Sequence, residues 1–381
     1  MSDHSEVFVA FDTSKLRNAV AIADGGRAGE VRFLGEFESS TTATSKLVRK
    51  LAAKYQRVTF CYEAGPTGYE LHRQIKVLGH ECIVVAPSLI PKKPGDRVKT
   101  NRRDAVSLAK LLRAGELTAV WVPDCRHEAV RDLTRGRETA VIDLRSKRQQ
   151  LSAFLLRQGR WYPAGKKTWT KAHMNWLASQ KFEQPERSIV CEEMIFAIRQ
   201  AQERVERLEQ AIRAAVPDWS LAKVVTALMA LRGIDLISAT GLLAELGDLS
   251  RFRTAPELMG YLGMGCSESS TGDTIKRGPI TKAGNRRARR TLVECAWSYQ
   301  HPPRIGIAKQ EKVAAAPPKV REIAWKAQSR LNRRYRALIR RGKLKTVAIT
   351  AVARELAGFV WAVAREAGSA EPATSKMGFA E

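Results

Sequence analysis

VFVAFDTSKLRNAVAIADGGRAGEVRFLGEF, residues 7–37, contains three short apolar runs separated by polar and turn-forming residues. The runs lie at 7–12, 18–23 and 31–37. Each has the length and the valine, isoleucine or phenylalanine content of a β-strand. The pair Gly25-Gly26, between the second and third runs, suits a tight turn. Three short strands in series predict an antiparallel meander at the start of the chain.

Helical and strand-like segments alternate after this meander. The spacing of Leu47, Val48 and Leu51 predicts a helix at 42–55. A strand, a helix, a second strand and a second helix are predicted next, at 57–62, 67–78, 81–86 and 102–113. Three strands followed by this alternation predict a mixed α/β domain, which we place at 1–125.

Helical periodicity replaces the strand-like runs after residue 125. Two long charged helices are predicted at 126–158 and 186–214, and they could pair as a hairpin, dimerise, or simply be solvated. We expect residues 126–218 to form a helical coiled-coil linker or oligomerisation segment. A mostly helical C-terminal domain is expected at 219–381.

The C-terminal domain begins with a turn at Gly233 between two apolar helical runs. This pattern is typical of a helix-hairpin-helix, in which backbone N–H groups of the turn approach a phosphate. Asp235 stands where such turns usually have a second glycine, so the match is incomplete. Residues 318–366 predict a helical tail with repeated arginines.

The charge of the chain is strongly unbalanced. There are 65 lysines and arginines against 39 acids, which gives a formal net charge of +26. Such an excess attracts polyanions and releases counterions when they bind, so nucleic acid is the first expected partner. An anionic membrane is less well supported, because the basic residues do not lie opposite an apolar face. A merely soluble basic protein is the remaining alternative.

Membrane and disulfide patterns are not expected. No apolar stretch reaches the roughly 18–20 residues of a membrane span, and the polar N-terminus does not have the pattern of a signal peptide. The six cysteines form no CxxC pair, which predicts small buried side chains and neither disulfides nor a zinc site. We therefore expect a cytoplasmic protein of prokaryotic type, associated with the nucleoid.

Three acids have positions that suit a metal site. Asp12 and Glu63 follow apolar strands, and Asp104 lies in the first turn of the helix predicted at 102–113. A carboxylate at a strand end is costly to desolvate unless something compensates, and Mg²⁺ takes carboxylate and water oxygens. Two such ions can support phosphodiester cleavage. The alternative is three unrelated acids that cap or solvate strand ends.

Several motifs together resemble a known family. In the first half they are FDTSK at 11–15, YEAGPTGYEL at 62–71 and KTNRRDAVSLAKLLRAGEL at 99–117. In the second half they include LRGIDLISATGLLAELGDLSRF at 231–252 and GPITKAGNRRARRTLVECAW at 278–297. The chain resembles the DEDD transposases, the Piv/MooV-like insertion-sequence one-ten family, and looks closest to its eleven-eleven subgroup. The resemblance covers roughly residues 7–365.

The resemblance implies a RuvC-like N-terminal domain with a ribonuclease H fold and four Mg²⁺-binding acids. Asp12 matches the first acid, Glu63 the second and Asp104 the fourth. Asn101 stands at the third position, which is a departure from the family pattern. An amide oxygen can still contact a metal or its water, but it lowers the negative charge of the site. Metal affinity or activity could be reduced.

The resemblance also implies a hydroxyl nucleophile in the C-terminal domain, within CSESSTGD at 266–273. The family hydroxyl directly precedes a glycine, and that position is Thr271. A threonine methyl crowds in-line attack, so Ser270 is the alternative, and an impaired protein is a third. Basic residues that could hold phosphates and stabilise the transition state surround this segment, namely Lys276, Arg277, Lys282, Arg286, Arg287, Arg289 and Arg290.

The implied function is transposition. Two or four subunits would join DNA sites, and a hydroxyl would form a covalent protein–DNA intermediate. A structured guide (bridge) RNA would select element ends and target, although the sequence shows no RNA-specific motif. Two alternatives remain open. One is a RuvC-like nuclease that cuts branched DNA with metal alone, and the other is a decayed, non-catalytic nucleic-acid-binding homologue.

Overall fold

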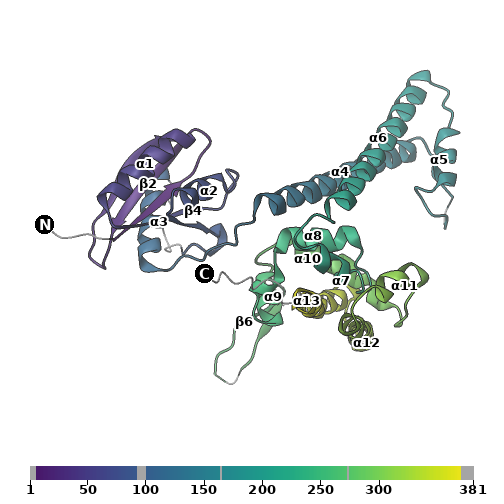
Figure 1. Cartoon of the computed structure of the whole chain (residues 1–381). Coiled ribbons are helices and arrows are strands. Elements are labelled where there is room, and N and C mark those ends of the chain that lie inside the picture. The colour runs from purple at the N-terminus through teal and green to yellow at the C-terminus, as the bar shows by residue number, and fades with distance from the viewer. Residues whose placement is uncertain (1–5, 92–99, 164, 273, 370–381) are drawn as a thin grey trace, which may run out of the picture. The chain divides into compact units, whose positions relative to one another are not determined.

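The structure is a computed structural model that describes residues 6–91, 100–163, 165–272 and 274–369 (Figure 1). The chain divides between Val122 and Pro123 into two compact units. The three predicted domains, 1–125, 126–218 and 219–381, stay predictions.

The first unit is built on a five-stranded sheet with the strand order β3-β2-β1-β4-β5. The strands are β1 (Glu6–Asp12), β2 (Arg17–Asp24), β3 (Val31–Glu38), β4 (Arg57–Glu63) and β5 (Glu81–Val85). β1, β2 and β3 pair antiparallel in sequence, whereas β1, β4 and β5 run parallel. The predicted antiparallel meander and mixed α/β class are confirmed.

Alternating side chains of the strands belong to two hydrophobic cores, one on each face of the sheet. Val7, Val9 and Phe11 of β1 point to one face, where they join the apolar side of α1 (Thr41–Lys54) and Ile75 of α2 (Glu70–Val77). Ala10 points to the other face and packs with α3 (Asn101–Ala114). This follows from the two-residue period of a strand. The sheet is therefore covered by helices on both faces.

The helix predicted at 67–78 begins later, at Glu70. Residues 66–69 form a turn instead, and Gly68 has a left-handed φ of 69°. A left-handed residue cannot continue a right-handed helix, so the prediction was wrong for this first turn. A short 3₁₀ segment, η1 (Pro87–Leu89), follows β5.

Two long helices open the second unit. They are α4 (Cys125–Arg157) and α6 (Pro185–Ala215), and the short α5 (Lys171–Ala178) lies between them in sequence. Asp124 caps α4 by accepting a hydrogen bond from the backbone of His127. α4 and α6 lie against each other in the same chain (Figure 1), sharing a core that includes Leu151 and Ile198. Their predicted part in oligomerisation stays a prediction.

The remainder of the second unit is mostly helical. Its helices are α7 (Ala222–Leu228), α8 (Leu236–Leu246), α9 (Ala255–Tyr261), α10 (Arg286–Ala296), α11 (Ile307–Ala314), α12 (Pro318–Arg340) and α13 (Lys345–Ser369), with 3₁₀ segments η2 (Leu249–Arg251) and η3 (Trp297–Gln300). β6 (Cys266–Glu268) and β7 (Arg277–Ile280) form an antiparallel hairpin. The tail predicted at 318–366 is two helices, because the chain turns at Gly342, whose φ is 71°.

α13 corrects one expectation. By length and composition it could cross a membrane, whereas no apolar stretch of that length was expected. Its residues Val352, Leu356 and Val360 are buried in the core shared with α10 and α12. Burial inside a helical core accounts for this composition. Among the described residues no other helix passes the same test.

The cysteines follow the expectation only in part. Cys61, Cys82, Cys191 and Cys295 are buried, but Cys125 and Cys266 are exposed, and all six are free thiols. The expectation of buried side chains was therefore wrong at two positions. Both lie at the first residue of an element, where the chain emerges from a loop.

Candidate active site and nucleic-acid interface

Two of the predicted metal ligands lie at the ends of neighbouring parallel strands. Asp12 ends β1 and Glu63 ends β4, and these strands are hydrogen-bonded to each other. The loops that follow also meet, since the hydroxyls of Thr13 and Thr67 are 3.1 Å apart. Asp12 is half-buried and Glu63 is exposed. Because adjacent strands lie about 4.8 Å apart, both carboxylates belong to one edge of the sheet.

The other two predicted positions open α3. Asn101 is its first residue and is exposed, and Asp104 lies in its first turn and is half-buried. α3 packs against β1 and β2. Across the described ranges, no group of three or more histidines, cysteines or acids lies close enough to hold a metal ion. The four metal-site roles therefore stay predictions.

The pair at the sheet edge nevertheless suits Mg²⁺. This ion commonly takes one or two protein carboxylates and completes its shell with water and substrate phosphate. Asp12 and Glu63 offer two carboxylates from rigid strand ends. Asn101 would add only a neutral amide oxygen. The donor set is thus compatible with a magnesium ion whose remaining ligands are water and a substrate phosphate.

The β6–β7 hairpin carries both predicted nucleophiles. Near its tip, Thr271 and Thr274 exchange two backbone hydrogen bonds of 3.2 Å. The Ser270 hydroxyl donates to a carboxylate oxygen of Glu268 over 2.9 Å, and the Arg277 guanidinium lies 3.3 Å from the other oxygen. The hydrogen bond from Ser270 and the pairing with Arg277 lower the pKa of Glu268. Ser270 therefore faces an ionised acceptor.

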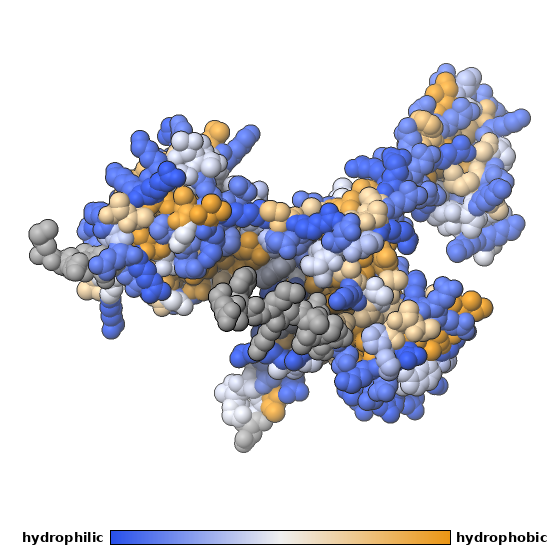
Figure 2. Space-filling model, viewed as in Figure 1, coloured by the Kyte–Doolittle hydropathy of each residue, from blue (hydrophilic) through white to orange (hydrophobic). Residues whose placement is uncertain are grey.

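The hairpin is a polar but weakly hydrophilic projection. In Figure 2 much of it is pale, which is the colour of serine, threonine and glycine, whereas most of the visible surface elsewhere is blue. Ser270 and Thr271 are both exposed. Asp273, which ends the predicted nucleophile segment, lies outside the described residues.

Two glycines cross at the base of this hairpin. Gly263 and Gly284 both have left-handed backbones, with φ of 63° and 73°. A β-carbon on Gly284 would lie 1.9 Å from the backbone oxygen of Tyr261, and one on Gly263 would lie 2.0 Å from that of Ala283. The two backbones therefore pack directly on each other, and no side chain fits between them. We call these residues the glycine crossing.

Arg289 and Arg277, both predicted nucleic-acid contacts, have partners inside the protein. One Arg289 nitrogen donates to the backbone oxygens of Leu262 and Ala283, over 2.7 and 2.9 Å. Arg289 thereby ties α10 to the glycine crossing. Arg277 pairs with Glu268, as described above. These two arginines therefore have a structural role in addition to the nucleic-acid contact that is predicted for them.

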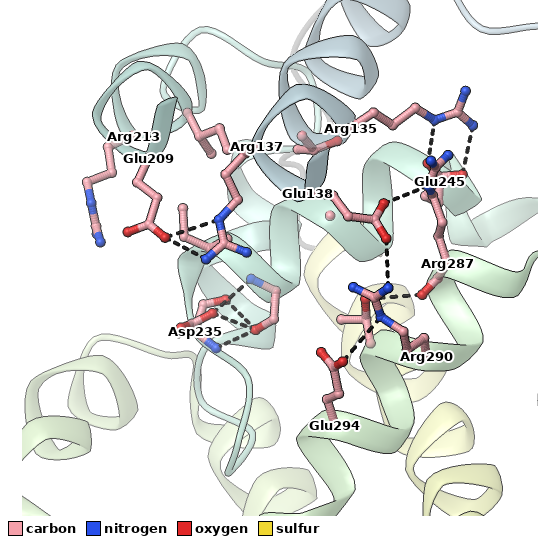
Figure 3. A pocket seen from close by; sticks show the side chains of 16 residues that line it. Arg135, Arg137, Glu138, Glu209, Arg213, Asp235, Glu245, Arg287, Arg290 and Glu294 are labelled. Carbon is pink, nitrogen blue, oxygen red and sulfur yellow. Dashed lines mark hydrogen bonds and ion pairs between the residues drawn. The ribbon is translucent and has the colours of Figure 1, made fainter. Parts of the chain in front are cut away.

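Arg287 and Arg290 are paired with a single acid of α4. Figure 3 shows both guanidinium groups turned toward Glu138. Nitrogen atoms of Arg287 and Arg290 lie 2.6 and 2.9 Å from its two carboxylate oxygens. The Glu138 side chain is only 18% exposed, so the pairing is partly shielded from water. These residues line a cavity of about 260 Å³ between α4, α6, α8 and α10. The two arginines join α10 to α4 and remain predicted contacts for DNA.

The other three predicted contacts are Lys276, Lys282 and Arg286. All are exposed, and within the described ranges none has an ion pair. Lys282 has a left-handed φ of 58°, and its backbone N–H bonds the oxygen of Gly263. These three cations are the ones that are free to meet a phosphate.

A second acid, which the sequence did not single out, links the same helices. Glu245 of α8 accepts from Arg135 of α4 over 2.7 Å and from Asn285, the cap of α10, over 2.8 Å (Figure 3 labels Glu245 and Arg135). Burial alone would raise the pKa of Glu245, but the hydrogen bonds of Arg135 and Asn285 lower it. Sequence separations of 110 and 40 residues leave no local signal for these pairs.

A turn at Gly233 joins α7 to α8, where the sequence predicts a helix-hairpin-helix, and that motif stays a prediction. Gly233 has a φ of 80°, and a β-carbon there would lie 2.4 Å from the backbone oxygen of Cys295, so the turn packs on the end of α10. Asp235 caps α8 by accepting from the Ser238 backbone over 2.8 Å. Because this carboxylate already occupies the helix N-terminus, phosphate binding by the turn stays a prediction.

The partly buried Lys309 of α11 hydrogen-bonds to the backbone of this turn. Its ammonium donates to three backbone carbonyl oxygens, those of Met229, Leu231 and Ile234. Burial, together with the charge of Lys312, lowers the pKa of Lys309 to about 8, against the opposing effect of Asp235. No motif in the sequence pointed to this lysine.

The lowered pKa of Lys309 predicts a pH-dependent stability. Between pH 8 and the ordinary lysine value of 10.5, the unfolded chain binds this proton more tightly than the folded one. The free energy of unfolding should therefore rise with pH through this window, by on the order of 2 kcal/mol from this group. Urea titrations at pH 7.5 and 10, followed by tryptophan emission, should show a smaller rise in Lys309→Met. An equal rise in both proteins would contradict the assignment.

Comparison with known proteins supports one family. A transposase profile of the DEDD type matches residues 9–158, and the profile described as the transposase IS116/IS110/IS902 family matches 225–306. The DEDD profile implies a ribonuclease H-like fold for the first unit, in agreement with its mixed sheet.

Named relatives agree with the profiles. The chain is 57% identical over 367 residues to y4qE, a protein of Sinorhizobium fredii that is named as a transposase, and covers 90% of its length. It is 28% identical over 339 residues to the transposase for insertion sequence element IS1533 of Leptospira borgpetersenii, and covers 96% of that protein. The chain is a DNA transposase and belongs to the IS116/IS110/IS902 family.

Proposed function

We propose that this transposase cuts DNA by direct attack of the Ser270 hydroxyl on a phosphodiester. The observation that carries the proposal is the 2.9 Å hydrogen bond from Ser270 to the Glu268 carboxylate. A hydroxyl is a weak nucleophile until a base takes its proton, and the hydrogen bond to Glu268 offers an acceptor for that proton. Thr271 matches the family position better, but its hydroxyl has no such acceptor among the described residues.

The step is a transesterification. Ser270 Oγ forms a bond to phosphorus while its proton passes to Glu268. The bond from phosphorus to one ester oxygen breaks, and that strand end leaves as a hydroxyl after taking a proton from solvent. The exposed Lys276, Lys282 and Arg286 lie on the same segment of chain and would neutralise the phosphate. Asp12 and Glu63 would hold Mg²⁺, which would polarise the DNA phosphate when bound.

Single substitutions in the hairpin test this assignment. Ser270→Ala should reduce formation of a covalent protein–DNA adduct at least about a hundredfold, because the nucleophile is lost. Thr271→Val should reduce it much less, and Glu268→Gln by about ten- to a hundredfold. Ser269→Ala is the matched control, because this exposed neighbour hydrogen-bonds through its backbone to Lys276. Denaturing gels of end-DNA reactions give the yields.

The same experiment separates the alternatives. An adduct that persists in Ser270→Ala and disappears in Thr271→Val would overturn the choice of hydroxyl but keep the reaction. Cleavage without any adduct, retained in the Ser270→Ala, Thr271→Val double variant, would indicate a metal-only nuclease. Binding of DNA with neither cleavage nor adduct in the unmodified protein would indicate a decayed homologue.

A guide RNA, a homo-oligomer and a cytoplasmic, nucleoid-associated location are part of the same proposal. The net charge of +26 and the exposed cations of the hairpin support a polyanionic partner. The α4–α6 pair offers long exposed faces to a second subunit, including Ile189 and Phe196 of α6. Adduct formation with and without the transcript that flanks the element tests the requirement for RNA.

A further inference from the structure

An open groove lies along α4, far in sequence from the hairpin that carries Ser270. It has a volume of about 450 Å³. One helical stripe of α4 and one residue of the loop before α5 line it, namely Val141, Leu144, Arg145, Arg148, Gln149, Ser152 and Trp169. The apolar floor, the single indole and the polar rim form the mixture typical of a small-ligand site.

Trp169 is held in a strained conformation beside this groove. Its φ of 61° is left-handed, which is a rare state for a bulky residue and costs about 1–3 kcal/mol. His173, which is 5% exposed, accepts a hydrogen bond from the Trp169 backbone N–H over 2.9 Å. The two rings meet edge to face at 5.0 Å. The fold thus spends stability to fix one indole at the groove.

Arg148 completes the stacking surface. Its guanidinium lies over the Trp169 ring at 4.9 Å. Its Nε atom is buried and has no hydrogen-bond partner, while another of its nitrogens reaches Gln202 only at 3.4 Å. Arg148 as a whole is only half-buried and lines the groove, so part of its side chain remains accessible to a ligand there. Guanidinium and indole planes are the surfaces on which unstacked bases lie in protein–nucleic-acid complexes.

The residues that line the groove, and the segment 158–182 beside it, include basic residues but no acid. Residues 158–182 contain five basic residues and no acid, and of these Lys166, Lys167 and Lys171 are exposed. Arg145 is exposed at the groove itself. This arrangement favours a phosphate close to the stacking surface.

We propose that this groove binds an unpaired nucleotide of a single-stranded segment, with the base on the Arg148–Trp169 pair and the phosphate at Arg145. A duplex would not fit this role, because its bases are already stacked on each other. The proposal goes beyond strand cleavage and does not depend on it. Single-stranded RNA and single-stranded DNA share the required chemistry, and the test distinguishes them.

The test uses the full-length protein and a 5-iodouracil-labelled oligonucleotide of about 12 residues, made as RNA and as DNA. Photocrosslinks are mapped by mass spectrometry, and affinities are measured by fluorescence anisotropy. Trp169→Ala should weaken binding of one or both single strands about tenfold, whereas Trp169→Phe should keep most of the affinity. Trp161→Ala is the matched control, because this tryptophan of the same segment is 69% exposed and does not line the groove.

The oligonucleotide whose affinity falls in Trp169→Ala identifies the ligand as single-stranded RNA, single-stranded DNA or both. Equal affinity of Trp169→Ala and the unmodified protein, or equal weakening of a duplex, overturns the proposal. So does a crosslink that maps outside residues 141–171, or a change of oligomeric state with unchanged affinity, which would make the groove a protein contact. Should circular dichroism show that Trp169→Ala perturbs the helices, Arg145→Glu gives the same comparison, with a loss of about tenfold expected.

Discussion

Replacing Asp12 by asparagine is expected to lower the rate of DNA strand cleavage at least about a thousandfold while the first unit stays folded. Asp12 ends the central strand β1 next to Glu63, and its side chain is only half-buried. The amide has nearly the same shape as the carboxylate but not its charge, so metal binding is lost and packing is kept. Cleavage of end DNA measured against Mg²⁺ and Mn²⁺ concentration shows the effect.

Glu38→Gln is the matched control for this substitution. Glu38 ends β3, pairs in register with Arg17 at the same edge of the sheet, and is exposed, but it lies two strands away from Asp12. It should cleave at the rate of the unmodified protein. Full activity of Asp12→Asn, or cleavage that survives removal of divalent ions by a chelator, would show that the sheet edge is not the metal site.

Gly284→Ala is expected to destabilise the second unit by at least about 3 kcal/mol and to abolish adduct formation. The new methyl would lie 1.9 Å from the Tyr261 oxygen, in a backbone with a left-handed φ. Neither backbone can move away without opening the glycine crossing, which sets the direction in which the β6–β7 hairpin leaves the fold. Denaturant unfolding and the adduct assay measure the two consequences.

Gly342→Ala separates crowding from backbone strain. Gly342 has nearly the same φ, 71° against 73°, but a β-carbon there would meet nothing within 4 Å. Its substitution should therefore cost only about 1 kcal/mol. If both alanine variants were equally stable, the close approach at Gly284 would have no energetic weight, and the hairpin would be positioned by other contacts.

The first unit was largely predictable because its signals are local. Apolar runs at 7–12, 18–23 and 31–37 mark strands that the structure places at Glu6–Asp12, Arg17–Asp24 and Val31–Glu38. A buried strand needs a short unbroken run of apolar residues, and such a run can be recognised in a single sequence. The strand ends then bring Asp12 and Glu63 to one edge, as their positions suggested.

The second unit was less predictable because its key features are short or distant in sequence. β6 and β7 have three and four residues, mostly exposed, so no apolar alternation marks them. The bond between Arg287 and Glu138 joins positions 149 residues apart. A run of arginines was therefore interpreted as a DNA surface, although part of it holds α10 against α4. The sequence also could not predict that Ser270, rather than Thr271, hydrogen-bonds to a carboxylate, because this contact depends on the geometry of the hairpin.

The length of α4 has a mechanical consequence. It is one helix of 33 residues, about 50 Å long. Near its start, His127 and Arg131 both bond the Ala244 oxygen, and Glu138 grips α10. The half beyond Glu138 carries the groove at Trp169. α4 thus links the groove to α10, the helix that follows the Ser270 hairpin. A force that a nucleic acid exerts at the groove would be transmitted along this rigid helix to α10.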